Sequence, residues 1–383
     1  MKALLFTLCF WASCGLPATA QSYWAKEYFQ RGELELYLGD YKQAIIQYDL
    51  AIGVWSSYAE AYFSRGRVYL LMKDLNKAAQ DFHRVTLLQP QKANAYFYLG
   101  AVFHENQELE HAITHYSQAL DLDTMFAIAY NYRAEAYRLQ GLSALSIRDY
   151  QKAIQYGGKE APLYFGRGKC NLSLQKPQEA AQDFTQAIAL EPRKMLYYQY
   201  RLEASFLAND YTQTAEDIEY ILKIKGDSTE QSYKSLLVFC YLKAKDWQKG
   251  VQAMERLPAQ DKQTAQFYVT RGNCYYELRE TEKALQDYQS LLALTPDSLA
   301  YRRKCVMMYF GGKDYENTIV QASHYLKSNP KDAEIWYWRG LSHFLLKHEA
   351  SFKPDLAEAQ KLGYKREDMD LRVQPFVKKK RKK

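Results

Sequence analysis

Three histidines have the spacing most suggestive of chemistry in this 383-residue sequence. His111 and His115 stand four residues apart, so a helix would place them on one face, with His104 on the preceding segment. Neutral imidazoles in this arrangement can bind zinc when a carboxylate such as Glu108 joins them. His115, however, takes a place where the repeats described below carry Asp, on an amphipathic segment with an exposed face. We therefore interpret these histidines as solvated or hydrogen-bonded and predict no metal; the alternative, a zinc-dependent enzyme, would require stoichiometric zinc.

The sequence contains none of the common catalytic motifs. A nucleophile elbow (GxSxG), a zinc-protease helix (HExxH) and a Walker A loop are all missing. Adjacent carboxylates such as Glu216 and Asp217 have basic neighbours, and no pocket can be argued around them. The sequence predicts no catalytic residues, no cofactor and a protein that is not an enzyme.

Composition excludes further classes. Apolar residues make up 48%, charged residues 25% and aromatic residues 15%, which is too much apolar surface for a disordered chain. The net charge of +7 is accounted for by Lys2 and the six basic residues of 378–383. The body is therefore neutral and lacks the basic stripe of a nucleic-acid-binding protein.

The elements that position these residues recur every 34 residues. Small residues mark the interval at Gly32, Gly66, Gly100, Ala134 and Gly168, and an aromatic residue stands four positions before each of them. Between Ala59 and Pro90, apolar positions follow a helical period in two stretches, with a turn signal at Lys73 and Asp74 between them. Each repeat is therefore predicted to be two helices joined by a short turn, and the small residues are predicted to lie where these helices cross.

This pattern of aromatic, Gly, Ala and Pro positions resembles the tetratricopeptide repeat. The resemblance covers residues 23–363 and implies an all-α, right-handed superhelical solenoid of about ten helix-turn-helix repeats. We expect repeats one to six at 23–226, repeats seven to ten at 227–363 and a cap or linker at 364–377, with a polar cap at 364–370. The repeats are predicted to start near Ala25, Ala59, Ala93, Ala127, Ala161, Met195, Gln231, Ala265, Leu299 and Ala333.

A charge pair accompanies the repeat. Arg precedes the small residue in several repeats, and Asp follows this Arg sixteen positions later. Because the two residues occur together, we predict ion pairs between the two helices or across a repeat boundary. The predicted pairs are Arg65–Asp81, Arg133–Asp149, Arg167–Asp183, Arg201–Asp217 and Arg271–Asp287.

The first twenty residues have the pattern of a signal peptide. Lys2 is followed by an apolar stretch, and small residues at Ala18 and Ala20 are typical of a cleavage site. We therefore predict that 1–20 is a signal peptide and that the protein is exported, to the periplasm or cell envelope of a bacterium; lipid attachment at Cys14 is an alternative. Four cysteines follow the signal, without metal or redox spacing, and we interpret them as buried apolar side chains: Cys170, Cys240, Cys274 and Cys305. The glycosylation sequon at Asn171 is treated as chance, because Asn171 is expected to face the interior.

The resemblance implies a function in protein binding. In tetratricopeptide solenoids the first helix of each repeat lines a concave groove that takes segments of partner proteins. The residues that bind a terminal carboxylate in chaperone-binding members are missing, apart from an isolated Asn273. An aromatic series at repeat spacing could bind a partner or simply pack between helices. The predicted partner-binding residues are Phe29, Tyr37, Phe63, Arg67, Phe97, His104, Glu135, Arg138, Phe165 and Lys169.

The basic tail offers a second possibility. Six adjacent like charges repel each other and are predicted to be disordered, and in an exported protein they could bind an anionic membrane or polyanion. Our leading hypothesis is an exported, non-enzymatic scaffold or adaptor that binds a partner protein in its groove, within a cell-envelope assembly. The alternative is a ligand-binding module tethered to anionic lipid or glycan by the tail residues Lys378, Lys379, Lys380, Arg381, Lys382 and Lys383.

Overall fold

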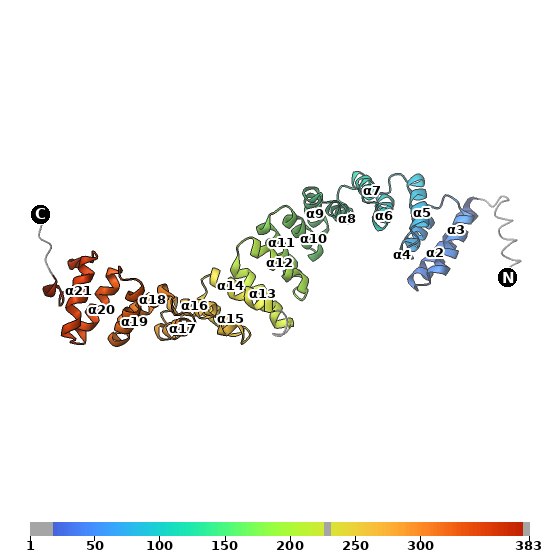
Figure 1. Cartoon of the computed structure of the whole chain (residues 1–383). Helices are drawn as coiled ribbons and strands as arrows, with labels where there is room; N and C mark the ends of the chain where they lie inside the picture. Colours follow the sequence, from blue (N-terminus) through green and yellow to red (C-terminus); the bar gives the residue numbers. More distant parts are fainter. Residues whose placement is uncertain (1–17, 226–230, 378–383) are drawn as a thin grey trace, which may run out of the picture. The chain divides into compact units, whose positions relative to one another are not determined.

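The computed structural model describes residues 18–225 and 231–377, and in these residues the chain is helical without a strand (Figure 1). The predicted all-α class is confirmed. We call the first helix of each repeat helix A and the second helix B. The A helices are α2 (Ala18–Tyr37), α4 (Ala59–Leu71), α6 (Ala93–Glu105), α8 (Ala127–Leu139), α10 (Ala161–Ser173), α12 (Met195–Leu207), α14 (Gln231–Lys243), α16 (Ala265–Glu277), α18 (Leu299–Gly311) and α20 (Ala333–Leu345). The B helices are α3 (Tyr41–Val54), α5 (Leu75–Leu88), α7 (Leu109–Leu122), α9 (Ser143–Gly157), α11 (Pro177–Leu190), α13 (Tyr211–Lys225), α15 (Trp247–Glu255), α17 (Thr281–Leu294), α19 (Tyr315–Ser328) and α21 (Glu349–Lys361). Three short 3-10 helices complete the described elements: η1 (Asp261–Gln263), η2 (Arg366–Asp368) and η3 (Gln374–Phe376).

The predicted repeat starts agree with the helix starts. From α4 onward, every A helix begins at its predicted residue. Only α2 differs: it begins at Ala18 instead of Ala25. The turn between the two helices of a repeat is also regular. In the second repeat Lys73 has φ 61°, and the Asp74 side chain then caps α5 by accepting a hydrogen bond from the Lys77 backbone N–H.

The small residues of the repeat lie where helices A and B cross. A Cβ built on Gly100 would lie 2.7 Å from Cδ1 of Tyr116, and one built on Gly168 would lie 2.6 Å from Cε1 of Phe184. A larger side chain would therefore push the two helices apart. This confirms the predicted reason for the small residues.

Arginine–aspartate ion pairs join helices A and B. The pairs Arg65–Asp81, Arg133–Asp149, Arg167–Asp183 and Arg271–Asp287 form as predicted. The structure adds Arg339–Asp355, which has the same spacing. Arg201 and Asp217 belong to different structural units, defined below, so their pairing stays a prediction.

The same arginines also reach back to the preceding repeat. Nη1 of Arg133 donates to Oγ of Ser117 at 2.9 Å, and Nη1 of Arg339 donates to Oγ of Ser323 at 3.1 Å. In each case the acceptor lies sixteen residues before the arginine. One guanidinium therefore connects three helices.

The chain divides into two units, Met1–Asn209 and Asp210–Lys383. Within each unit the described helices stack in chain order, each against the next, so neighbouring repeats of the same unit contact each other. The predicted division into 23–226 and 227–363 stays a prediction.

The end of the last repeat is covered by residues 364–377. Helix α21 ends before Gly363, which has φ 105°, and the chain then turns back so that the ring of Tyr364 stacks on Tyr337 with centroids 4.4 Å apart. Met369 and Val373 are buried against the apolar residues of α20 and α21. The predicted cap at 364–370 is polar at most positions, but Tyr364 and Met369 add apolar contacts with the helix pair α20 and α21.

Two of the predicted segments lie outside the described residues. These are the signal peptide, up to residue 17, and the basic tail 378–383; the export signal, lipid attachment at Cys14 and the tethered-module alternative therefore stay predictions. Across 18–225 and 231–377, no helix combines the length and apolar character needed to cross a membrane.

The cysteines and Asn171 behave as expected. Cys170, Cys240, Cys274 and Cys305 are buried and unpaired, and burial raises the pKa of the Cys305 thiol to about 12. Asn171 is buried, and its Nδ2 donates to Oδ2 of Asp183 at 2.9 Å. The interior position predicted for Asn171 is confirmed.

Candidate partner-binding groove

A groove of about 860 Å³ runs across four successive A helices, α4, α6, α8 and α10, in the first unit. Six of the ten predicted partner-binding residues line it: Arg67, Phe97, His104, Glu135, Phe165 and Lys169. The repeat places them together because helix A of each repeat presents the same face to one side. The groove wall combines exposed apolar side chains with separate charges.

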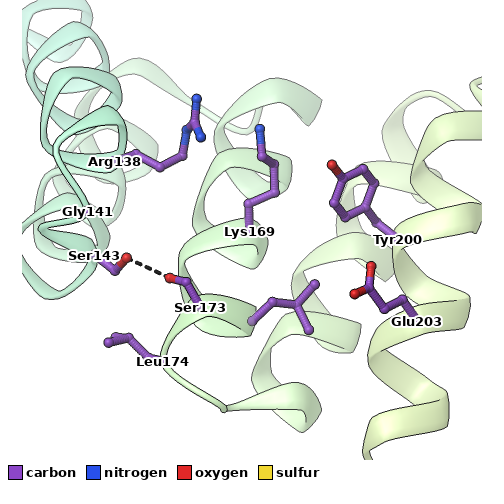
Figure 2. Close-up of a pocket in the computed structure, with 9 residues that line it drawn as sticks. Arg138, Gly141, Ser143, Lys169, Ser173, Leu174, Tyr200 and Glu203 are labelled. Atoms are coloured by element: carbon purple, nitrogen blue, oxygen red, sulfur yellow. Dashed lines mark hydrogen bonds between the residues drawn. The ribbon is translucent and has the colours of Figure 1, made fainter.

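A smaller pocket of about 480 Å³ adjoins this groove and shares Lys169 with it. Arg138 from α8 and Tyr200 from α12 line the pocket beside Lys169 from α10. Figure 2 shows the polar ends of these three side chains extending toward the same side of the pocket. On the opposite side, the hydroxyl oxygens of Ser143 and Ser173 are hydrogen-bonded 2.6 Å apart.

Three predicted residues line neither cavity. The side chain of Tyr37, at the end of α2, is 88% exposed. Phe29 packs against Tyr58 of the next repeat with ring centroids 5.4 Å apart, and Phe63 packs against Tyr98 at 5.2 Å.

The aromatic series packs between repeats, and part of it also lines the groove. Phe97 contacts Tyr132 of the next repeat with ring centroids 5.2 Å apart and is 7% exposed. Phe165 contacts Tyr200 of the next repeat at 5.0 Å and is half-buried. The sequence left packing and partner binding as alternatives; at these two positions the ring has packing contacts and an edge on the groove.

Glu135 is held by its own neighbours. Its carboxylate accepts hydrogen bonds from Nε of Arg138 at 2.9 Å and from the Tyr150 hydroxyl at 2.7 Å, and a second Arg138 nitrogen also donates to it. Burial alone would raise the pKa of Glu135, but the bonds from Arg138 and Tyr150 hold it below its usual value. The Glu135 carboxylate is thus ionised and already bonded.

A regular relation links this position of helix A to the residue fifteen positions later on helix B. In three repeats helix A carries an acceptor and helix B carries a tyrosine that donates to it: Tyr48 to Glu33 at 2.6 Å, and Tyr288 to Asn273 at 2.9 Å, as Tyr150 does to Glu135. The sixth repeat differs, because Ile218 is the residue fifteen positions after Glu203. Where helix A carries a cation, helix B carries phenylalanine: Phe82 for Arg67 and Phe184 for Lys169. Phenylalanine offers no acceptor, so helix B does not bond the two cations.

The three histidines do not form a metal site. Nδ1 of His115 lies 2.8 Å from Oε1 of Gln118 and its ring stacks on Phe103, whereas Nδ1 of His111 lies 3.0 Å from Glu108. His104 lines the groove instead, and burial lowers its pKa, so it is neutral at pH 7. No group of three or more His, Cys, Asp or Glu side chains that could hold a metal occurs in the described residues.

Two exposed apolar residues of the groove and the tyrosine of the smaller pocket are not among the predicted residues. Ile128 is 55% exposed and Tyr132 is 42% exposed, both on α8. Tyr132 and Tyr200 belong to a series of positions spaced by 34 residues, which runs Tyr98, Tyr132, Gly166 and Tyr200. The series lies one position after the series of Phe97 and Phe165, so the same 34-residue spacing would have identified Tyr132 and Tyr200.

These features define a helical repeat protein with a groove across its A helices, and segments of the chain match known repeat families. Segments 29–85, 161–194 and 265–298 match models described as tetratricopeptide repeat, and 102–141 matches one described as TPR repeat. These four segments therefore have the sequence pattern of tetratricopeptide repeats.

Among curated proteins, the chain is similar to tetratricopeptide repeat protein 16 of Homo sapiens and of Macaca fascicularis. The identities are 22% and 23% over 240 residues, which cover 61% of this chain and 25% of each relative. The match thus spans about a quarter of the length of these relatives.

Among solved structures, the fold is similar to that of MamA, with 24% identity, 45% of this chain and 94% of the MamA chain covered, and a TM-score of 0.42. It is also similar to PilW, described as a type IV pilus biogenesis factor, with 13% identity, 56% of this chain and 98% of the PilW chain covered, and a TM-score of 0.46.

Proposed function

We propose that this protein is a non-enzymatic scaffold or adaptor that binds a segment of a partner protein in the groove across α4, α6, α8 and α10. The observation that carries the proposal is the groove itself, of about 860 Å³, with exposed Ile128 and Tyr132 beside separate charges. Apolar anchors that lose water on binding supply most of the affinity of such an interface, and the charges set the register.

We further infer that the protein acts after export, in a cell-envelope assembly. The support for this inference is the N-terminal pattern of Lys2, an apolar stretch and small residues at Ala18 and Ala20. Sequencing the N-terminus of the protein isolated from its source tests it: a chain that begins at Gln21 supports export, and one that retains Met1 opposes it.

Cross-linked capture from the source organism tests the groove. The double variant Ile128→Ser/Tyr132→Ala removes two exposed apolar side chains, and Leu87→Ser is the matched control, because Leu87 is 60% exposed on α5 outside the groove. We expect one protein partner to be recovered with wild type and with the control, and to be lost with the double variant.

Equal recovery with all three baits would show that the groove is not the binding surface. Recovery that depends on residues 378–383 and not on the double variant would favour the tethered module.

A further inference from the structure

The pocket beside the groove contains three hydrogen-bond donors that lack an acceptor within the described residues. Lys169 is half-buried, and no carboxylate of the described chain lies within ion-pair distance of its Nζ. Its ammonium lies 5.4 Å from the centroid of the Phe165 ring, and helix B offers Phe184 where other repeats have a hydrogen-bonding tyrosine. Lys169 is therefore a cation beside an aromatic ring, with no carboxylate of the described residues in direct contact with it; the charge of Glu135 acts on it from beyond ion-pair distance.

The charge of Glu135 attracts Lys169, but this carboxylate is bonded to other donors and makes no ion pair with Nζ of Lys169 in the described chain. Both oxygens of Glu135 are already bonded, to Nε and Nη2 of Arg138 and to the hydroxyl of Tyr150. Glu203 also lines the pocket, but it is exposed and makes no ion pair with Lys169 or Arg138 in the described chain.

The other two donors reach the same pocket. Arg138 uses Nε and Nη2 on Glu135, which leaves Nη1 without an acceptor among the described residues. The Tyr200 ring is fixed by its contacts with Phe165 and Phe184, at 5.0 and 5.6 Å, while its hydroxyl also lacks a partner there. Figure 2 shows Arg138, Lys169 and Tyr200 directed to one side of the pocket.

Burial and the like charge of Arg138 lower the pKa of the Lys169 ammonium. An anion between the two cations would oppose both effects, because opposite charge favours the protonated form. A partly desolvated site with two cations and a hydroxyl donor is suited to an anion with several acceptor oxygens.

We propose that Arg138, Lys169 and Tyr200 form a subsite for a carboxylate, supplied by an acidic side chain of the protein segment that occupies the groove. This inference rests on the proposed function and specifies its ligand. Because the pocket and the groove share Lys169, a segment with apolar side chains on Ile128 and Tyr132 can place one Asp or Glu next to Lys169. Specificity then comes from the desolvated charge pair, and affinity from the apolar anchors.

Selection of random twelve-residue peptides on the full-length chain tests the subsite. We expect the enriched peptides to carry an acidic residue, and replacement of this residue by its amide to weaken binding about tenfold, the loss typical of a charge-assisted hydrogen bond. The same replacement should have little effect on binding to Lys169→Gln. Tyr200→Phe, which keeps the ring and removes the hydroxyl, should produce a smaller loss than Lys169→Gln.

The control is Lys176→Gln, which removes a charge from an exposed lysine of the same repeat outside both cavities. It should leave the preference for acidic peptides unchanged. An amide replacement that weakens binding equally in wild type and Lys169→Gln would overturn the subsite, as would enrichment of peptides without acidic residues.

Binding of the selected peptides to the variants distinguishes a wrong subsite from a wrong proposed function. Peptides that bind equally well to the Ile128→Ser/Tyr132→Ala variant would show that the groove is not used, and both proposals would fall. Peptides that need the groove but ignore Lys169 would leave the groove and remove the subsite. Binding of inorganic phosphate that is lost in Lys169→Gln, without selection of acidic peptides, would assign the site to phosphate and refute the carboxylate.

Discussion

Replacing Asp183 by Asn tests whether the Arg–Asp pairs stabilise the repeat. Asp183 is 4% exposed and accepts hydrogen bonds from Arg167, with Nε 3.1 Å from each carboxylate oxygen, and from Asn171 at 2.9 Å. The substitution keeps the volume but removes the charge, and its amide N–H groups would face the donors of Arg167 and Asn171. The guanidinium would then remain between helices without its counter-ion.

The magnitude follows from the burial of the two partners. Removing one partner of a buried ion pair costs roughly 3–5 kcal/mol. Because the Arg167 side chain keeps 22% of its exposure, water can solvate part of its charge, and we expect a loss of about 3 kcal/mol.

The matched control is an exposed ion pair in the first repeat, made by the arginine at the same position of helix A as Arg167. There Arg31 pairs with Glu27 on its own helix, and the side chains are 56% and 35% exposed. Glu27→Gln should cost at most about 0.5 kcal/mol, as for exposed pairs four residues apart on a helix.

Hydrogen exchange measured by mass spectrometry is the suitable assay, because a repeat protein can open locally and its global unfolding need not be two-state. Asp183→Asn should increase exchange in α10 and α11, and Glu27→Gln should leave α2 and α3 nearly unchanged. The double substitution Arg167→Met/Asp183→Leu should recover much of the loss, since it leaves no unpaired charge. A cost for Asp183→Asn no greater than that of Glu27→Gln would refute the argument.

Two further predictions concern the turns and the histidines. Gln175 has φ 57°, so Gln175→Gly should stabilise its turn by about 1 kcal/mol. Gly141 lies at the equivalent turn with φ 77° and open space around it, so Gly141→Gln should destabilise that turn by a similar amount. Equal thermal midpoints for the two variants would contradict this prediction. Burial lowers the pKa values of His104 and His115 in the folded protein below the usual 6.5, so the unfolded chain binds protons first as the pH falls. The stability of the fold should therefore decrease as the pH falls from 6.5 through the lower folded pKa values. In thermal melts between pH 7 and 5, the midpoint of the double variant His104→Asn/His115→Asn should depend less on pH. An unchanged pH dependence of the midpoint would exclude these two histidines as its source.

The periodic part of this protein could be predicted from its sequence. Helix starts from Ala59 to Ala333 and the Arg–Asp spacing of sixteen are properties within one repeat, so each copy reports the same local geometry. A single helix crossing explains why Gly100 and Gly168 recur, and the fixed interval makes these signals visible without any long-range information.

The parts that depend on contacts without periodicity came only from the tertiary structure. Residues 364–377 follow no repeat, so their apolar contact with the last helix pair could not be read from spacing. The sequence placed Arg138 and Lys169 among the groove residues, but it could not show that Glu135 is already bonded by Arg138 and Tyr150. Whether a charge on a repeat surface is paired or available depends on distances of a few ångströms between neighbouring repeats, and the fold alone sets those distances.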